Sequence, residues 1–229
     1  MTGSEIVGRH GYDEAAAELI AQCRALAHRG LVLAAAGNAS VAVGEYILLT
    51  SSGAAFAELE PAALTLVDRA GIVVSGRRPP TSELALHLAA YRRPEVSAVV
   101  HTHGRHAVAL STVVSEVPAL HYYAVDLGGP VPVAPYRRFG TSELAEVTTR
   151  VLGTGNGVVM AHHGSLTVGT SLSQAAARAE LLEWLCQVAL LALAAGTPAS
   201  LSSAELDDVG LAMRPGHRPD APGTDGEQL

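Results

Sequence analysis

Apolar residues recur at helical spacing in two long stretches of the chain. Positions three or four apart predict one helix over 12–29 and another over 173–195. Each stretch is followed by a glycine, Gly30 or Gly196, which is typical of a helix end.

Two shorter helices are indicated by a repeated tetrapeptide. Thr81-Ser82-Glu83-Leu84 recurs as Thr141-Ser142-Glu143-Leu144, and in both copies a hydroxyl can cap the helix while an early carboxylate favours its dipole. We therefore expect helices to begin at Thr81 and Thr141, the first extending over 81–92.

Runs of apolar and β-branched residues predict the strands. These runs are 40–43, 46–50, 64–68, 72–75, 97–102, 157–161 and 166–170. Residues 69–71 fit a hairpin turn, and Pro132 limits 131–133 to an edge strand. Helices that alternate with hairpin-type strands predict an α/β fold of the α+β type, with a central, largely antiparallel sheet covered by helices.

The chain of 229 residues suits a single domain, which we place at 1–213. Residues 214–229 are rich in Pro, Gly and Asp, and we expect a flexible tail there. The start of the chain has no apolar run of signal-peptide type, and 181–195 is too short and too polar to span a membrane. Cys23 and Cys186 fall in apolar helical patterns and are expected to be buried free thiols, as in a cytoplasmic protein.

The charged residues exclude two classes of function. A net charge of −7 argues against nucleic acid as the partner, because phosphate backbones require clustered cations. The sequence contains no lysine, and all 15 of its basic residues are arginine. Aldol chemistry through a Schiff base needs a lysine amine, so an aldolase with this sequence would have to use a metal.

Histidines at the ends of two predicted strands form a candidate metal site. His101 and His103 are two residues apart, so their side chains leave the same face of a strand. His163 follows the apolar strand over 157–161, and its neighbour His162 competes for the same role. Three neutral imidazoles with an open position are typical of catalytic zinc.

Other residues could complete a site around this metal. Glu83 precedes the strand that carries the histidine pair, where a carboxylate acid or base could approach the ion. Small, donor-rich loops at 37–40 and 50–53, together with Thr81 and Ser82, could hold a phosphate without cations.

These residues together resemble the class II aldolase/adducin family. The landmarks are Gly37-Asn38-Ala39-Ser40, Pro80-Thr81-Ser82-Glu83, Val99-Val100-His101-Thr102-His103 and His162-His163-Gly164. The resemblance runs from the first helix to about Ala195, and the segment from Val117 to Tyr122 is similar to the aldolase branch.

The resemblance implies one zinc ion per subunit on His101, His103 and His163, with Glu83 as fourth ligand or as the acid/base. It favours His163 over His162, because the family's ligand immediately precedes the glycine. It also implies a homotetramer in which Tyr122 acts as a catalytic residue in the site of an adjacent subunit. The phosphate of the substrate would lie against six residues: Gly37, Asn38, Ser52, Gly53, Thr81 and Ser82.

The expected reaction is cleavage of a ketose 1-phosphate, such as L-fuculose 1-phosphate, to dihydroxyacetone phosphate and a short aldehyde. After Trp184 the chain lacks the aromatic residues that often close the family's aldehyde pocket, so that pocket is expected to differ. A sugar-phosphate epimerase, for which Asp126 is a candidate residue, a dehydratase or a decarboxylase remains an alternative on the same fold. A non-catalytic scaffold of the adducin type is an alternative of another class.

Overall fold

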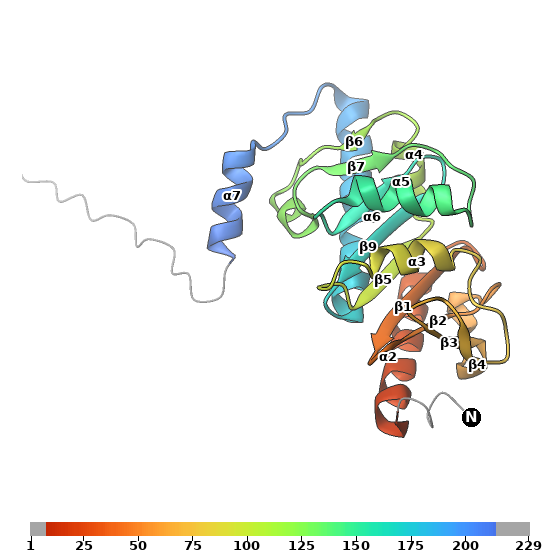
Figure 1. Cartoon of the computed structure of the whole chain (residues 1–229). Coiled ribbons are helices and arrows are strands. Elements are labelled where there is room, and N and C mark those ends of the chain that lie inside the picture. The colour runs from red at the N-terminus through yellow and green to blue at the C-terminus, as the bar shows by residue number, and fades with distance from the viewer. Residues whose placement is uncertain (1–7, 214–229) are drawn as a thin grey trace, which may run out of the picture.

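The structure is a computed structural model that describes residues 8–213. One open β-sheet runs through this part of the chain. Within these residues nine strands follow the order β4-β3-β2-β1-β5-β9-β8-β7-β6 (Figure 1). Neighbouring strands are antiparallel except for β7 and β8, which are parallel. The predicted α/β fold with a largely antiparallel sheet is therefore confirmed. The tail predicted at 214–229 lies outside the described residues.

The elements have the following bounds. The strands are β1 (Gly37–Val43), β2 (Tyr46–Thr50), β3 (Leu64–Asp68), β4 (Val73–Gly76), β5 (Ala98–Thr102), β6 (Glu116–Val117), β7 (Val131–Ala134), β8 (Gly157–Met160) and β9 (Gly164–Gly169). The α-helices are α2 (Arg9–His28), α3 (Leu84–Ala90), α4 (Arg105–Leu110), α5 (Ser142–Leu152), α6 (Leu172–Ala195) and α7 (Ser203–Ala212). Short 3-10 helices are η1 (Phe56–Glu58), η2 (Pro61–Ala63) and η3 (Tyr122–Leu127).

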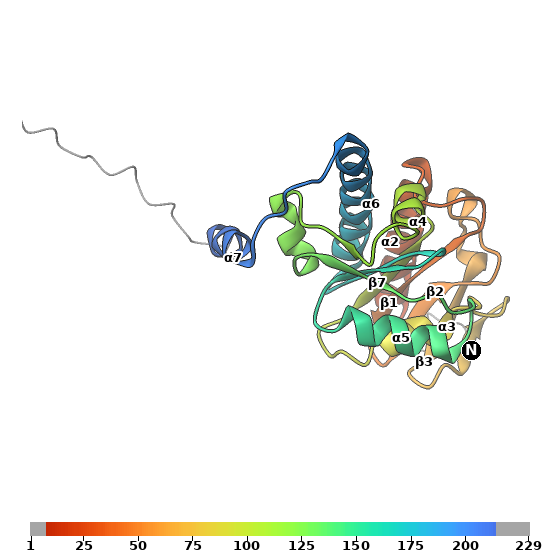
Figure 2. The ribbon, with the colours of Figure 1, turned by 90° about the horizontal axis from the view of Figure 1, so that it is seen from above.

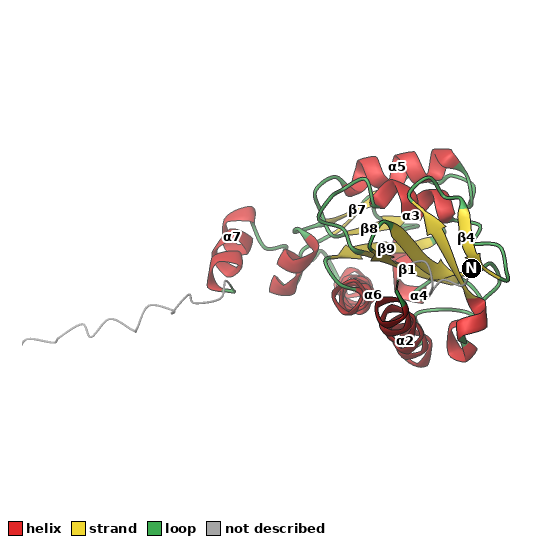
Figure 3. Cartoon of the chain, turned by 60° about the horizontal axis from the view of Figure 1, so that its bottom comes forward, coloured by secondary structure: helices red, strands yellow, loops and turns green. Residues whose placement is uncertain are grey.

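Helices cover both faces of the sheet. Figures 2 and 3 show α3 and α5 on one face and α2, α4 and α6 on the other. Side chains of β2 alternate between the two layers, with Leu48 in the core beside α2 and Ile47 and Leu49 in the core beside α3 and α5. Strands β1, β5 and β9 are accordingly buried at nearly every position, and polar residues in them such as Ser40 and Thr167 are hydrogen-bonded.

Most of the predicted elements are present close to their expected bounds. β2 and β3 have the predicted limits, and Asp68 accepts hydrogen bonds from the backbone N–H of Ala70 and Ile72 in the predicted hairpin turn. The prediction that 131–133 is an edge strand was wrong, because β7 lies between β8 and β6. Pro132 is tolerated there since β8 pairs with β7 only from Val133 onward, beyond the proline.

The helix expected from Thr81 begins three residues later, which is a second correction. The backbone N–H of Thr81 donates to the carbonyl of Thr50, and Pro80 forms an isolated bridge with Ser51. The segment therefore stays extended beside β2 and turns only at Thr81. As a result Glu83 is the N-cap residue of α3 rather than a residue inside the helix.

Two helices were not predicted from the sequence. α4 has only six residues, too few to show a period. α7 begins with a capping box between Ser202 and Glu205, a signal that the sequence does contain. Within residues 8–213 no helix is long and apolar enough to cross a bilayer, and Cys23 and Cys186 are buried and free, as expected.

Candidate active site

The central strand β5 delivers two of the predicted metal ligands. His101 lies in β5 directly opposite Asn38 of β1, and His103 follows the last residue of the strand. Val99, two residues before His101, belongs to the core beside α3. Because alternate residues share a face, His101 points toward the side of the sheet on which α3 begins.

The third histidine comes from the tight turn between β8 and β9. His163 directly precedes Gly164, the first residue of β9, where a Cβ atom would overlap the carbonyl oxygen of Thr102. Only glycine therefore allows this turn to approach β5 closely. His162 adopts a left-handed conformation with φ 58°, so the two histidines lie in a turn rather than on the predicted strand.

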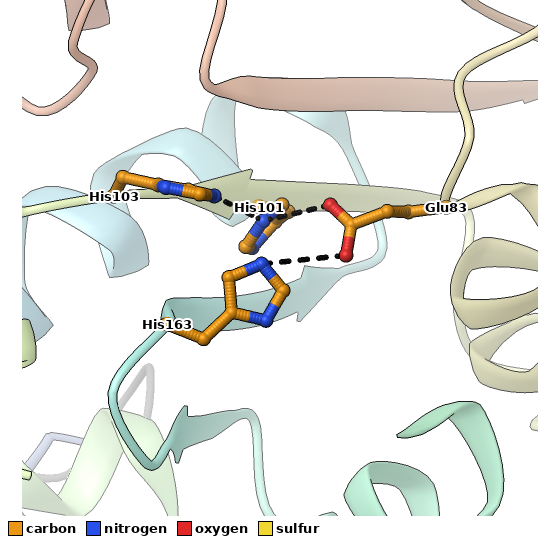
Figure 4. Close-up of side chains that lie close together, drawn as sticks. All are labelled: Glu83, His101, His103 and His163. Atoms are coloured by element: carbon orange, nitrogen blue, oxygen red, sulfur yellow. Dashed lines mark hydrogen bonds and ion pairs between the residues drawn. The ribbon is translucent and has the colours of Figure 1, made fainter. Parts of the chain in front are cut away.

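Four side chains converge where these elements meet. Figure 4 shows Glu83, His101, His103 and His163, whose ligand atoms all lie within 4.8 Å of one another. His101 Nε2 is 2.9 Å from Glu83 Oε2 and 2.9 Å from His103 Nε2, and His163 Nε2 is 3.4 Å from Glu83 Oε1. We call these four residues the histidine–glutamate cluster. All four are residues that the sequence motifs indicate for this site.

The donor set of the histidine–glutamate cluster fits a divalent cation. The Nδ1–H of His101 donates to the carbonyl oxygen of Ser165 at 2.8 Å, so Nε2 is the ring nitrogen that faces the centre and would ligate a cation there. Glu83 Oε1 is buried, and it has no hydrogen-bond partner within the described structure. Lone pairs that face one another in a buried site are stabilised by a shared cation, and imidazole and carboxylate are ligands that zinc accepts.

The pKa values within the cluster shift in different directions. Burial by itself would lower the pKa of His101, but the charge of Glu83 and the hydrogen bonds with Glu83 and with the Ser165 carbonyl raise it above its usual value. Burial, together with the charge of His101, lowers the pKa of His103 to about 3 and that of His163 to about 4, so both rings are neutral at pH 7. Burial by itself would raise the pKa of Glu83, but the charge of His101 and hydrogen bonds from His101 and Asn38 lower it far below its usual range. Glu83 is therefore a carboxylate at rest.

The histidine–glutamate cluster opens into a cavity of about 290 Å³. All six residues predicted to bind a phosphate line this cavity: Gly37, Asn38, Ser52, Gly53, Thr81 and Ser82. The cavity wall also contains residues that no sequence motif placed there: Tyr136, Arg137, Phe139 and His162. His162 thus lines the cavity, but of the two adjacent histidines only His163 belongs to the histidine–glutamate cluster, as the resemblance implied.

Comparison with known proteins identifies the family. Residues 17–190 match the model of the class II aldolase and adducin N-terminal domain. This chain is a member of the class II aldolase and adducin family. The resemblance expected from the sequence motifs is thereby confirmed.

Two members of this family with similar sequences are sugar-phosphate aldolases. L-fuculose phosphate aldolase of Escherichia coli (strain K12) is 34% identical over 192 residues, which cover 83% of this chain and 89% of that enzyme. A 5-methylthioribulose-1-phosphate/5-deoxyribulose-1-phosphate aldolase of Rhodospirillum rubrum is 34% identical over 213 residues, covering 91% and 92%.

A solved structure supports the same assignment. An L-fuculose 1-phosphate aldolase superposes with a TM-score of 0.82 at 31% identity, covering 85% of this chain and 93% of that one.

Tyr122 lies outside the cavity of its own chain. It lies on η3, is 42% exposed, and does not line the cavity. Its ring stacks on His121 at 4.3 Å, and His121 also contacts Tyr123 and Trp184 at ring distances of 5.1 and 4.9 Å. We call His121, Tyr122, Tyr123 and Trp184 the aromatic patch.

The histidine–glutamate cluster predicts how the two adjacent histidines differ in metal binding. His163→Ala removes a ligand and should weaken binding at least about tenfold, whereas His162→Ala should leave one ion per chain. Both variants would be loaded with zinc, dialysed and analysed for metal by mass spectrometry. Equal loss of metal from the two variants would contradict the assignment.

Proposed function

We propose that this protein is a zinc-dependent class II aldolase that cleaves a ketose 1-phosphate to dihydroxyacetone phosphate and a short aldehyde. The observation that carries the proposal is a buried histidine–glutamate cluster at one wall of a cavity whose other walls offer small hydroxyl- and amide-bearing loops. L-fuculose 1-phosphate is the reference substrate. The similar aldolases are named after different sugars, but each of these sugars is phosphorylated.

The proposed phosphate site relies on neutral donors and on glycines. Ser52, Thr81 and Ser82 bring hydroxyl groups to the cavity, and Gly53, with φ 69°, leaves open space where a side chain would stand. Gly37 is required for packing, because a Cβ there would lie 2.8 Å from Cγ1 of Val32. Backbone N–H groups and hydroxyls in such loops bind phosphate oxygens without a formal charge.

Glu83 and Tyr122 have separate tasks in the proposed reaction. When bound, the zinc ion would polarise the substrate carbonyl and stabilise the negative charge that develops when the C3–C4 bond breaks. The C4 hydroxyl loses a proton as it becomes the aldehyde, and we assign assistance in this transfer to Tyr122. Glu83 is a carboxylate at rest, so it would first take up the proton that the C4 hydroxyl loses and then deliver a proton to C3 of the enediolate. In the synthetic direction it would remove that proton from C3.

The alternatives have less support in the structure. Asp126, the candidate residue for an epimerase, forms an ion pair with Arg178 at 2.9 Å and does not line the cavity. A non-catalytic scaffold would not need a buried carboxylate oxygen that lies among histidines without a hydrogen-bond partner.

The first test is dihydroxyacetone phosphate release from L-fuculose 1-phosphate and from 5-deoxyribulose 1-phosphate, followed with a coupled dehydrogenase. We expect release with zinc and loss of activity with a chelator, restored by added zinc. Protein shown to contain zinc that releases the product from no ketose 1-phosphate would overturn the proposal.

We further propose a homotetramer with shared active sites. Tyr122 is exposed and lies outside the cavity of its own chain, so it can take part in catalysis only from another copy. The aromatic patch around it supplies exposed apolar surface of the kind that interfaces bury.

This arrangement can be tested by complementation between two inactive variants. Glu83→Gln and Tyr122→Phe should each lower kcat at least about a hundredfold, the scale of a lost acid/base group. When the two variants are co-expressed, a site shared between subunits would be intact in about one quarter of random pairings, so activity should return.

No recovery in mixed oligomers would place Tyr122 in the site of its own subunit and contradict the shared site. The matched control is Tyr123→Phe, which should turn over normally because it keeps the ring that belongs to the aromatic patch and removes only a hydroxyl with no assigned role. Native mass spectrometry would verify both the tetramer and the mixing.

Arg137 adds a cation to a site that was expected to have none. It lines the cavity, its side chain is exposed, and within the described chain its guanidinium donates only to the carbonyl of Tyr136. In a chain of net charge −7, we infer that this guanidinium attracts the dianionic phosphate.

Arg137→Ala should raise KM about three- to tenfold with little change in kcat, because an exposed charge is partly screened. Arg138→Ala is the matched control, since Arg138 does not line the cavity. KM would be measured at low and high salt, and the salt dependence should fall in Arg137→Ala alone. Identical behaviour of the two variants would refute this role.

A further inference from the structure

A buried chain of hydrogen bonds leads from the core to the active-site carboxylate. The Tyr91 hydroxyl is 2.8 Å from Ser40 Oγ, and Ser40 Oγ is 2.6 Å from His87 Nδ1. His87 Nε2 is 2.6 Å from Asn38 Oδ1, and Asn38 Nδ2 donates to Glu83 Oε2 at 3.0 Å. All five residues are buried. We call them the α3–β1 hydrogen-bond chain.

The α3–β1 hydrogen-bond chain forms because the spacing of side chains along α3 matches their spacing along β1. Glu83, His87 and Tyr91 are four residues apart, so their side chains lie along one side of α3 and its two caps. Asn38 and Ser40 are two residues apart and share one face of β1. The helix and the strand thus place alternating donors and acceptors against each other.

Each hydrogen bond fixes the direction of the next. The carboxylate of Glu83 only accepts, so Asn38 must donate its NH2 group and keep its carbonyl oxygen for His87. His87 must then donate from Nε2, which leaves Nδ1 as an acceptor for the Ser40 hydroxyl. Ser40 in turn accepts from Tyr91.

The electrostatics agree with this order. Burial, with the charge of His101, lowers the pKa of His87 to about 3, so the ring is neutral and has one acceptor nitrogen. Burial raises the pKa of Tyr91, so its hydroxyl keeps the proton that it donates. All four links are therefore satisfied, which is the condition under which a buried polar network is rigid.

The last hydrogen bond of the α3–β1 hydrogen-bond chain holds one carboxylate oxygen of Glu83. The other oxygen has no hydrogen bond of this kind. Oε2 of Glu83 accepts from Asn38, whereas Oε1 has no hydrogen-bond partner within the described structure and is the oxygen near His163. The amide of Asn38 is thus hydrogen-bonded to both His87 and Glu83. Only its second N–H is left to donate to a phosphate.

We propose that His87, Ser40 and Tyr91 are positioning residues that lock the amide of Asn38 and thereby fix which oxygen of Glu83 faces the reacting atoms. The inference rests on the proposed function, in which Glu83 transfers a proton. Without His87 the amide of Asn38 can rotate and turn its oxygen toward the carboxylate, which would displace Glu83 by repulsion.

The order of the hydrogen bonds can be tested without activity. Nitrogen-15 spectra of the zinc-loaded full chain, with His87 assigned by the loss of its signals in His87→Gln, report which ring nitrogen carries the proton. We expect a neutral ring protonated on Nε2. A ring protonated on Nδ1, or on both nitrogens, at neutral pH would overturn the proposed order.

Kinetics test the positioning role. His87→Leu should lower kcat about 10- to 100-fold, the usual scale for a residue that orients a ligand, with KM changed by less than about twofold and zinc content unchanged. His87→Gln should recover most of kcat, because its amide can still donate to Asn38. In an Asn38→Ala background, His87→Leu should have no further effect if it acts through Asn38.

Normal kcat in folded, zinc-loaded His87→Leu, or independent effects in the double variant, would refute the role. Should His87→Leu fail to fold, Ser40→Ala and Tyr91→Phe remove single hydroxyls and should show a smaller loss confined to kcat. A wild-type protein that releases no dihydroxyacetone phosphate would refute the proposed function instead, and the nitrogen-15 result would still decide the hydrogen-bond order.

Discussion

Three imidazoles and one carboxylate direct their electron pairs into one small buried volume, and much of the architecture serves to hold them there. Such a group of acceptors is unfavourable unless a cation or protons occupy its centre. The rigid sheet supplies His101 and His103, the turn between β8 and β9 supplies His163, and the start of α3 supplies Glu83. Burial keeps the pKa values of His103 and His163 low, so both rings stay available as ligands.

Two walls of the cavity around the histidine–glutamate cluster differ in chemistry. Small loops with hydroxyl groups, such as those of Ser52 and Ser82, suit a phosphate, while Tyr136 and Phe139 give an aromatic surface on the segment after β7. This aromatic surface lies in the middle of the chain. It is therefore a candidate for the aldehyde pocket in a protein that has no aromatic residue after Trp184.

The sequence indicated the four residues that the structure brings together because they lie beside strong local signals. His101 and His103 end an apolar strand, and His163 precedes a glycine that a close backbone approach requires. The start of α3 was misplaced because the pairing of Thr81 with Thr50, distant in sequence, overrides the local capping signal. His162 lines the cavity together with His163 because the two residues lie in a turn, which no local pattern in the sequence specified.

The sequence by itself therefore determined the fold class, the family and the four side chains of the histidine–glutamate cluster, since short-range periodicity and residue chemistry encode them. Only the tertiary structure decided how residues distant in sequence combine. It brought Arg137 to the cavity, placed Tyr122 outside it, and joined Tyr91 to Glu83 through Ser40, His87 and Asn38. These contacts depend on the packing of α3 against β1 and on the path of the segment after β7, and no local pattern specifies either of them.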